Sequence, residues 1–345
     1  MTMQARWLVG AAIVVLMTIS GGGRACADTL WAVSMRRAIQ SPADGPRQFP
    51  AVVTALDIQP HGRLIAAAGD DHVIRIWNMD DGTLVHRLVG HDDWVRAVAF
   101  SPDGTVLVSS GNDRRVLMWD VATGTFKGQL AAYDHAIGTV AFSHSGRFLV
   151  TAGFKDKLSI LDVTQQSAAR ELHCGCSDLR AIAISEDDRH VAVAGRDGTI
   201  RIWDLTTWKL VRENKAHALR IRAIVFAQED TQLISGGEDR VVRVWNWQTD
   251  GQSYTLPEQP AKILAMVKCG RQMVATAGSD NIIRLWDLTA RSELGQLTGH
   301  VGSVSALAYQ DGTLVSGGFD TFLRIWQIPD AMEDGVRSAQ RERLP

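Results

Sequence analysis

The sequence has little net charge, few cysteines and few long apolar runs, and each scarcity narrows the possible functions. Its formal net charge of −2 and the lack of any long basic block exclude a nucleic-acid partner, because phosphate binding needs a basic face. Only three of its four cysteines lie beyond residue 27, so these three cannot all pair with one another. A hydrophobic content of 46% and a charged content of 21% are globular values, which neither a disordered chain nor a bundle of membrane helices has.

Sequence motifs of catalysis are missing as well. The chain has no nucleophile elbow, no phosphate-cradling glycine loop followed by lysine and no zinc-protease helix. The pattern that attaches haem is absent too. We therefore expect no catalytic residues, no cofactor and no enzymatic activity.

The one long apolar run lies near the start of the chain. Arg6 precedes an apolar stretch over residues 7–20, glycines 21–23 interrupt it, and Ala25-Cys26-Ala27 follows as a small-x-small cleavage site. This layout predicts a secretory signal peptide over residues 1–27 and an exported, periplasmic protein. The run is shorter than the ~20 residues that span a bilayer. An uncleaved membrane anchor is the alternative, and it is the only membrane contact we expect.

A repeat dominates the rest of the chain. Apolar segments such as VIRIW, TIRIW and FLRIW recur every 40 to 42 residues. Their last residues are Trp77, Trp119, Leu161, Trp203, Trp245, Trp286 and Trp326. Six of the 11 tryptophans thus occupy one register position. This period is that of β-propeller blades, each made of four short strands.

Each repeat also has the residue pattern of an antiparallel meander. In the second repeat, four β-forming runs over 95–100, 106–109, 115–120 and 125–130 are separated by turns rich in Gly, Pro, Asp and Asn. We expect an all-β fold with seven blades of four antiparallel strands over residues 49–328.

The repeats resemble the WD-repeat family. Gly90-His91 and Gly299-His300 match the Gly-His pair that marks each blade in that family, and Trp119-Asp120 is one of three Trp-Asp pairs. A turn aspartate stands six residues before the register position in six repeats: Asp71, Asp113, Asp197, Asp239, Asp280 and Asp320. The resemblance covers residues 49 to 328, and with seven repeats in register it is specific.

The resemblance implies a hydrogen-bonded chain of histidine, turn aspartate, strand hydroxyl and tryptophan in each complete blade. Blades 2, 5 and 7 carry all four members: His91, Asp113, Ser109 and Trp119; His217, Asp239, Ser235 and Trp245; His300, Asp320, Ser316 and Trp326. We assign these residues a structural role, since a fully satisfied buried network makes a blade rigid.

Other repeats depart from the pattern. Blade 3 has Tyr133 at the histidine position, Lys155 at the aspartate position and Leu161 at the tryptophan position, so we expect it to be the softest. Two more blades lack the histidine and the hydroxyl: Phe49 and Ala67 stand there in blade 1, and Gly175 and Val193 in blade 4. Sequence drift in a long repeat array and a functional role of the altered blades explain such departures equally well.

The ring of blades needs a closing strand. The last repeat ends at Gln327-Ile328 and lacks its outermost strand, whereas residues 30–39 read as a strand with no repeat of their own. In the family, an N-terminal strand usually completes the last blade and leaves no open sheet edge. We expect residues 28–48 to do this, residues 329–345 to form a flexible tail, and the propeller to be a monomer.

One cluster has the residue types of a metal site. His173, Cys174 and Cys176 place three ligands for copper or zinc within four residues, at the connection between blades 3 and 4. A strained link between the two cysteines and unpaired thiols are the other readings. A metal- or small-molecule-binding propeller with a redox or cofactor role is therefore the alternative to our main interpretation.

The surface that family members usually use for binding carries arginines and aromatic residues here. We call it the top face: the end where innermost strands begin and where the aspartate turns lie. The candidate partner-binding residues are Trp94, Arg96, Phe154, Arg180, Arg196, Arg220, Arg222, Lys262 and Phe319. Such residues are enriched in interface hot spots and suit an acidic partner segment. Alternatively, Asp92, Asp93, Asp178 and Glu238 pair with the arginines and leave a solvated rim.

These observations predict a non-catalytic scaffold in the cell envelope, which binds a protein or peptide on its top face.

Overall fold

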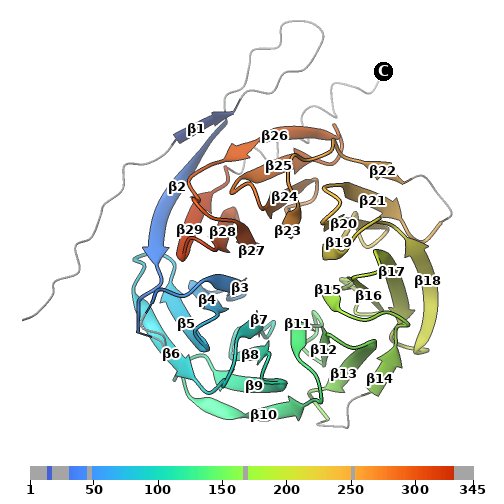
Figure 1. Cartoon of the computed structure of the whole chain (residues 1–345), viewed down its shortest axis with the longest axis horizontal. Coiled ribbons are helices and arrows are strands. Elements are labelled where there is room, and N and C mark those ends of the chain that lie inside the picture. Colours follow the sequence, from blue (N-terminus) through green and yellow to red (C-terminus); the bar gives the residue numbers. More distant parts are fainter. Residues whose placement is uncertain (1–13, 18–30, 45–48, 166–169, 250–252, 330–345) are drawn as a thin grey trace, which may run out of the picture.

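The computed structural model describes residues 14–17, 31–44, 49–165, 170–249 and 253–329. Within these ranges it forms seven antiparallel sheets, arranged as blades around a central channel (Figure 1). The expected seven-bladed, all-β propeller is thereby confirmed. Blades 1 to 6 are the sheets β3–β6, β7–β10, β11–β14, β15–β18, β19–β22 and β23–β26, and blade 7 contains β27–β29 together with β2 and β1.

The innermost strands surround the channel, and the second strands lie behind them (Figure 1). The innermost strands are β3 (Val53–Ile58), β7 (Val95–Phe100), β11 (Ile137–Phe142), β15 (Leu179–Ile184), β19 (Ile221–Ala227), β23 (Ile263–Cys269) and β27 (Val304–Gln310). The second strands are β4 (Leu64–Gly69), β8 (Val106–Gly111), β12 (Phe148–Gly153), β16 (His190–Gly195), β20 (Gln232–Gly237), β24 (Met273–Gly278) and β28 (Thr313–Gly318). Second strands are buried along nearly their whole length, because a neighbouring blade covers each face.

The third and outermost strands complete the blades. The third strands are β5 (Val73–Asn78), β9 (Arg115–Asp120), β13 (Lys157–Asp162), β17 (Thr199–Asp204), β21 (Val242–Asn246), β25 (Ile283–Asp287) and β29 (Phe322–Gln327). The outermost strands are β6 (Leu84–Val89), β10 (Phe126–Ala132), β14 (Arg170–His173), β18 (Lys209–Lys215), β22 (Tyr254–Thr255) and β26 (Ser292–Leu297). In β18 six of seven residues are exposed, as expected for the rim of the ring.

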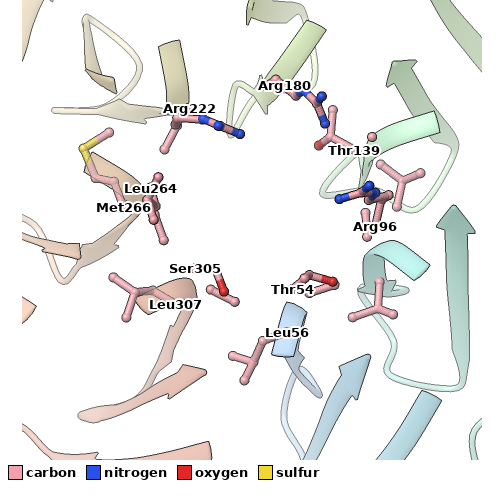
Figure 2. Close-up of a pocket in the computed structure, with 18 of the residues that line it drawn as sticks. Thr54, Leu56, Arg96, Thr139, Arg180, Arg222, Leu264, Met266, Ser305 and Leu307 are labelled. Carbon is pink, nitrogen blue, oxygen red and sulfur yellow. The ribbon is translucent and has the colours of Figure 1, made fainter. Parts of the chain in front are cut away.

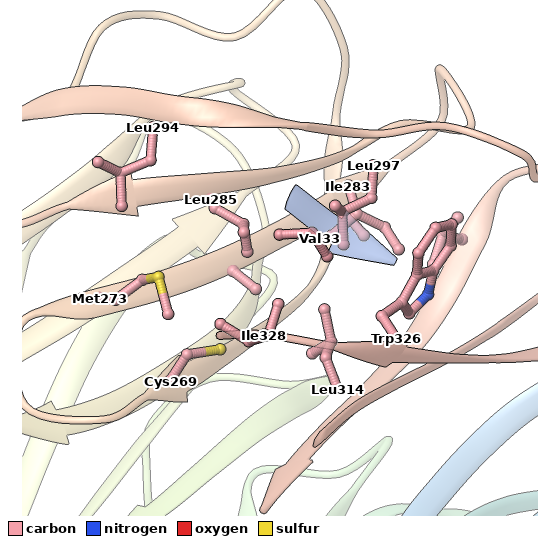
Figure 3. Packing of buried hydrophobic residues seen from close by; sticks show 13 residues of the cluster. Val33, Cys269, Met273, Ile283, Leu285, Leu294, Leu297, Leu314, Trp326 and Ile328 are labelled. Carbon is pink, nitrogen blue, oxygen red and sulfur yellow. The ribbon is translucent and has the colours of Figure 1, made fainter. Parts of the chain in front are cut away.

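An N-terminal strand closes the ring, as the sequence predicts. Strand β2 (Trp31–Gln40) pairs antiparallel with β29 and so supplies the missing outermost strand of blade 7. Figure 3 shows Val33 of β2 among Ile283, Leu285 and Trp326, in a cluster where Val33 and Trp326 are fully buried. Hydrophobic burial therefore joins the two ends of the repeat array.

A fifth strand in blade 7 was not expected. Strand β1 (Val14–Met17) pairs with β2 and lies within the apolar run of residues 7–20. The rest of the expected signal segment and the expected tail beyond residue 329 fall outside the described residues. Within the described part of the chain, no helix is long and apolar enough to cross a membrane.

The turn aspartates shape the turns between second and third strands. In six blades the Oδ1 atom of this aspartate accepts the N–H of the residue two positions later, for example Thr199 N to Asp197 at 3.1 Å. The residue between them has a positive φ, such as 67° at Arg114. An aspartate side chain supports such a turn by replacing a backbone acceptor. Blade 3, which has Lys155 at this position, has no positive φ in its turn.

Candidate functional site: an arginine-lined channel mouth

A glycine at the end of each second strand brings the two segments of the top face together. A Cβ atom at Gly111 would collide with the carbonyl oxygen of Trp94, and one at Gly237 with that of Arg220. These same carbonyls accept the N–H of the residue that follows each glycine, at 2.9 Å in both blades. The close approach therefore fixes the residue before each innermost strand beside the aspartate turn, which is where the candidate residues lie.

The innermost strands enclose a cavity of about 390 Å³ in the channel. Figure 2 shows Arg96, Arg180 and Arg222, from β7, β15 and β19, along one arc of its wall. On the opposite side Leu56, Leu264, Met266 and Leu307 line the cavity, and Figure 2 shows Thr54 and Ser305 among them. The channel mouth thus has a cationic side in blades 2, 4 and 5 and a side of leucine, methionine and hydroxyl residues in blades 6, 7 and 1.

Arg96 is held at its Nε atom. This atom donates to Oδ1 of Asn112 at 2.9 Å, and the guanidinium lies 4.6 Å from the centre of the Trp94 ring. Burial lowers the pKa of Arg96 below its usual value, and Asp93 opposes that shift. Asn112 is neutral, so among the described residues Arg96 has no carboxylate in direct contact, and Asp92 pairs with Arg115 instead.

Arg180 is held by a carboxylate and an aromatic ring. Its Nε atom lies 2.5 Å from Asp178, and its guanidinium lies 4.1 Å from the centre of the Phe154 ring. Burial lowers the pKa of Arg180, against the effect of Asp178. Asp178 also pairs with Arg220 at 2.7 Å, so one carboxylate serves two guanidinium groups.

Glu238 holds the remaining cations of this arc. Its Oε1 atom lies 3.0 Å from Arg220 and 2.7 Å from Arg222, and its Oε2 atom lies 3.8 Å from Lys262. Burial acts to raise the pKa of Glu238, but Arg222 and Arg220 hold it below its usual value. Asp178 and Glu238 therefore pair with the arginines of blades 4 and 5, in line with the alternative that the sequence left open, whereas Arg96 has only the amide of Asn112.

Exposed apolar side chains surround the mouth. Phe319 is 55% exposed and also lines the channel, and Phe154 is partly exposed in the corresponding turn of blade 3. Val301 and Leu219, which are 82% and 50% exposed, were not among the sequence-predicted residues. They lie one and two residues after His300 and His217, so their distance from the repeat histidine is the signal that could have identified them. Arg196 is exposed beside its turn aspartate.

The structural networks of blades 2 and 7 contain all four expected members. In blade 2, His91 Nδ1 lies 2.7 Å from Asp113, His91 Nε2 lies 2.7 Å from Ser109, and the Trp119 indole N–H donates to Ser109 at 2.8 Å. Blade 7 repeats this arrangement with distances of 3.0, 2.8 and 2.9 Å: His300 to Asp320, His300 to Ser316 and Trp326 to Ser316. These contacts use both nitrogens of each ring, so the histidines support the blade rather than face the channel.

Blade 5 departs from the expected network. His217 contacts Asp239 at 2.9 Å and Ser235 at 2.8 Å, but within the described residues Trp245 makes no hydrogen bond to Ser235. Trp245 is only partly buried, whereas Trp247, two residues later, is 5% exposed and donates to the carbonyl of Asp230 at 2.6 Å. Trp245 keeps the register of the other blades, since it pairs with Leu233 of β20 as Trp119 pairs with Leu107 of β8. Trp247 occupies the position of the buried Val121 in blade 2.

Sequence reasoning missed two network members in other blades. In blade 6, Gln259 takes the histidine position and contacts Thr276 at 3.2 Å, and Thr276 accepts the indole N–H of Trp286 at 2.9 Å. An arginine four residues after the turn aspartate pairs with it in several blades, as Arg284 does with Asp280 at 2.7 Å. The recurrent arginine in segments such as VIRIW and FLRIW was the available signal.

Blade 1 lacks its network for a simple reason. Ala67 offers no hydroxyl, and the buried indole N–H of Trp77 has no hydrogen-bond partner in the described structure. Phe49 is 74% exposed, so it does not fill the histidine position as the alignment suggested.

The cysteines of the candidate metal cluster are buried and separated from the histidine. Cys174 and Cys176 are 3% and 7% exposed within the apolar cluster between blades 3 and 4, whereas His173 is exposed at the end of β14. Burial raises the pKa of Cys174 to about 12, and burial together with Asp197 raises that of Cys176 to about 11. Both thiols are therefore protonated, and no group of metal-ligating residues forms among the described residues. Cys176, beside Asp197, occupies the place where other blades have histidine.

Comparison with known proteins gives a family match over more than half of the chain. The model for the WD domain, G-beta repeat (WD40), matches residues 46–78, 82–120, 168–204, 208–246 and 291–327. The stretches without a match, 121–167 and 247–290, contain the blades in which Tyr133 and Gln259 replace histidine.

Curated relatives match only short pieces. Mitochondrial division protein 1 of Mycosarcoma maydis is 40% identical over 55 residues, which is 16% of this chain and 7% of that protein. A U3 snoRNP-associated protein-like protein of Arabidopsis thaliana is 40% identical over 75 residues, which is 21% of this chain and 15% of that protein. The matched piece is thus a small part of each relative. Together, the seven blades, the histidine networks and the family match show that the chain belongs to the WD40-repeat family, whose members are generally non-catalytic scaffolds.

Proposed function

We propose that this protein is a scaffold that binds a protein or peptide partner on its top face. The observation that carries the proposal is the set of exposed apolar side chains on the top-face loops, Phe319, Val301, Phe154 and Leu219, together with the arginine-lined channel, which Phe319 also lines. Apolar anchors beside arginines are the composition of interface hot spots. The blades behind them are held by buried hydrogen bonds, so the face is preorganised and a partner need not order it on binding.

The chain offers a matched pair of phenylalanines to test this proposal. Phe319 on the top face and Phe126 on the outermost strand β10 are both 55% exposed. Affinity capture from the native cell extract, with chemical crosslinking, should recover a discrete partner with the wild type and with Phe126→Ala. Phe319→Ala and the triple variant Trp94→Ala/Arg180→Ala/Arg222→Ala should lose it while remaining folded by circular dichroism. Equal recovery by all four proteins would contradict a top-face site.

We further propose that the protein is exported and works in the cell envelope. Residues 1–27, with Arg6, the apolar run and the Ala25-Cys26-Ala27 site, support this proposal. N-terminal sequencing of the protein from its own cells should give Asp28 as the first residue. An intact N-terminus in the membrane fraction would instead indicate an anchor, and an intact N-terminus in the cytosol would overturn export.

A further inference from the structure

Arg96, Arg180 and Arg222 occupy the same register position in their innermost strands, and two other blades have hydroxyl residues at this position. At this position Thr54 and Ser305 donate to backbone carbonyls of neighbouring blades, Val95 at 2.9 Å and Val53 at 2.6 Å. These two hydroxyls therefore have a structural role at the blade seams. The arginines at the same position contact side chains instead. Arg96 and Arg222 contact turn residues of their own blades, whereas Arg180 contacts Asp178 of its own blade and the Phe154 ring of blade 3. Seam packing therefore does not account for Arg96 and Arg222.

The arginines present part of each guanidinium group to the channel. Arg96 and Arg222 each donate their Nε atom to a turn side chain, Asn112 and Glu238, at 2.9 Å. The terminal nitrogens of Arg96 make no other hydrogen bond in the described structure, and Figure 2 shows them directed into the channel. A terminal nitrogen of Arg222 also lies 2.7 Å from Glu238, so of these two guanidinium groups it is that of Arg96 that keeps its paired N–H donors available for a planar anion.

The charges of this region leave an excess of positive charge. Arg96, Arg180, Arg220, Arg222 and Lys262 form the cationic side. The carboxylates that act on these five cations are those of Asp178, Glu238 and, more remotely, Asp93. Five cations and three carboxylates leave an excess of two positive charges, so this side of the channel attracts an anionic group.

The wall opposite the arginines defines what accompanies the anion. Leu56, Leu264, Met266 and Leu307 give the wall across the channel its apolar surface, beside the hydroxyl residues Thr54 and Ser305. The cavity of about 390 Å³ has the size of a small-ligand site. An amphipathic group can therefore contact both sides at once.

We propose that the channel mouth binds a carboxylate group with an apolar group beside it, the carboxylate held by the Arg96, Arg180 and Arg222 guanidinium groups. An acidic side chain next to a leucine in a partner segment and a free small carboxylate supply the same chemistry. In the first case the inference rests on the proposed scaffold function and names the chemistry of the bound segment; in the second it stands by itself.

Isothermal titration of the purified full-length chain distinguishes these sources. The probes are acetyl-Leu-Glu-Leu-amide, its glutamine counterpart, 4-methylpentanoate and inorganic phosphate. We expect the glutamate peptide to bind and the glutamine peptide to bind at least about tenfold more weakly, because a charge-assisted hydrogen bond is lost. If 4-methylpentanoate, a single carboxylate with an apolar group, binds as tightly as the glutamate peptide, the source is a free carboxylate; if it does not, the source is a peptide.

Variants then assign the binding to the arginines. Arg96→Gln and Arg222→Gln should each weaken binding of the preferred probe at least about tenfold, whereas Arg189→Gln, an exposed arginine in the turn at the other end of the channel, should leave it unchanged. Arg96→Lys keeps the charge but loses the paired donors, so its affinity for the probe should lie between that of Arg96→Gln and that of the wild type. It also serves as a control for misfolding of the glutamine variants.

Three results would overturn the inference: no binding of either carboxylate probe, equal binding by Arg96→Gln and wild type, or binding of phosphate alone. Partner capture that needs Phe319, together with no carboxylate binding, would remove only this inference and leave the scaffold function in place.

Discussion

Blades 2 and 3 are neighbours with the same strand order but different interiors. In blade 2, Asp113 is 5% exposed and joins His91 and Arg115 in one polar network. In blade 3 the corresponding Lys155 is exposed and pairs with Asp134 at the surface, and Leu161 replaces the tryptophan. The cluster between blades 2 and 3 has five fully buried apolar residues, whereas that between blades 1 and 2 has thirteen.

The comparison shows that the blade backbone does not require the polar network. In blade 3 the Tyr133 hydroxyl contacts Thr151 at 2.9 Å, so a tyrosine reaches the strand hydroxyl that a histidine reaches elsewhere. Once a network is present, however, each member depends on the others, because removing one leaves buried polar groups without partners. The two blades should therefore respond very differently to equivalent substitutions.

The largest effect should come from Asp113→Ala. This change leaves His91 without its carboxylate and Arg115 with that of Asp92 alone, and it removes acceptors for the N–H groups of Asp92 and Arg115. We expect a loss of about 3 kcal/mol in the free energy of unfolding, measured by urea denaturation. A loss below about 1 kcal/mol would mean that blade 2 tolerates an open network as blade 3 does.

The free energy of unfolding should depend on pH through buried network histidines such as His300, and not through blade 3. Burial lowers the pKa of His300, so the folded ring stays neutral while the unfolded ring takes up a proton near its usual pKa of about 6.5. The stability contribution is complete above that pH and is lost as the pH falls below it.

Urea denaturation at pH 7.5 and 5.5 tests this dependence. His300→Gln should lose less stability than the wild type over this range, whereas Tyr133→Phe should match the wild type in slope. Asp57, whose pKa burial raises to about 6, contributes the opposite slope to every one of these proteins and so does not affect the differences. Equal slopes for His300→Gln and the wild type would show that His300 does not titrate differently in the two states.

Tyr133→Phe tests the substitute network itself. It removes the hydroxyl that contacts Thr151 and keeps the ring, so we expect a loss of about 1 kcal/mol by urea denaturation. The double variant with Thr151→Val should cost less than the sum of the two single changes, since both remove the same bond. Strict additivity would mean that this bond does not stabilise blade 3.

Ala67→Ser should give blade 1 part of the polar network that blade 2 has. The new hydroxyl stands where Ser109 accepts the indole N–H in blade 2, and it offers a partner to the buried Trp77 indole. We expect a gain of about 0.5 to 1 kcal/mol in thermal or urea unfolding. A destabilised variant would indicate that the position has no room for the oxygen.

Lys155→Ala should have the smallest effect. Lys155 and Asp134 are 46% and 71% exposed, and exposed pairs contribute little because water and salt screen them. We expect a change within about 0.5 kcal/mol, in contrast to Asp113→Ala at the equivalent position of blade 2. A loss as large as that of Asp113→Ala would erase the distinction between the two blades.

Periodicity made the fold predictable, since seven copies of one pattern report the same structure independently. Individual sites were less predictable, because a register position does not show where a side chain points. Phe49, aligned with histidine, is exposed, and Trp245 keeps its register position but, within the described residues, lacks the predicted hydrogen bond to Ser235. Cys176 stands beside Asp197 although the alignment placed Gly175 there. These departures concern the course of a loop or the direction of a side chain, and neither leaves a mark on the repeat.

By itself, the sequence determined the number of blades, the order of their strands, the closing strand near residues 30–39 and the members of the networks in blades 2 and 7. Each follows from local patterning, because apolar alternation and turn residues act over a few positions. Only the tertiary structure decided that Arg96, Arg180 and Arg222 face one cavity, that Glu238 and Asp178 neutralise some of their neighbours, and that Arg96 has no carboxylate in contact. The physical reason is that the repeat pattern fixes the place of each strand but not the direction of its channel-facing side chains, and the cavity that they share exists only once the ring has closed.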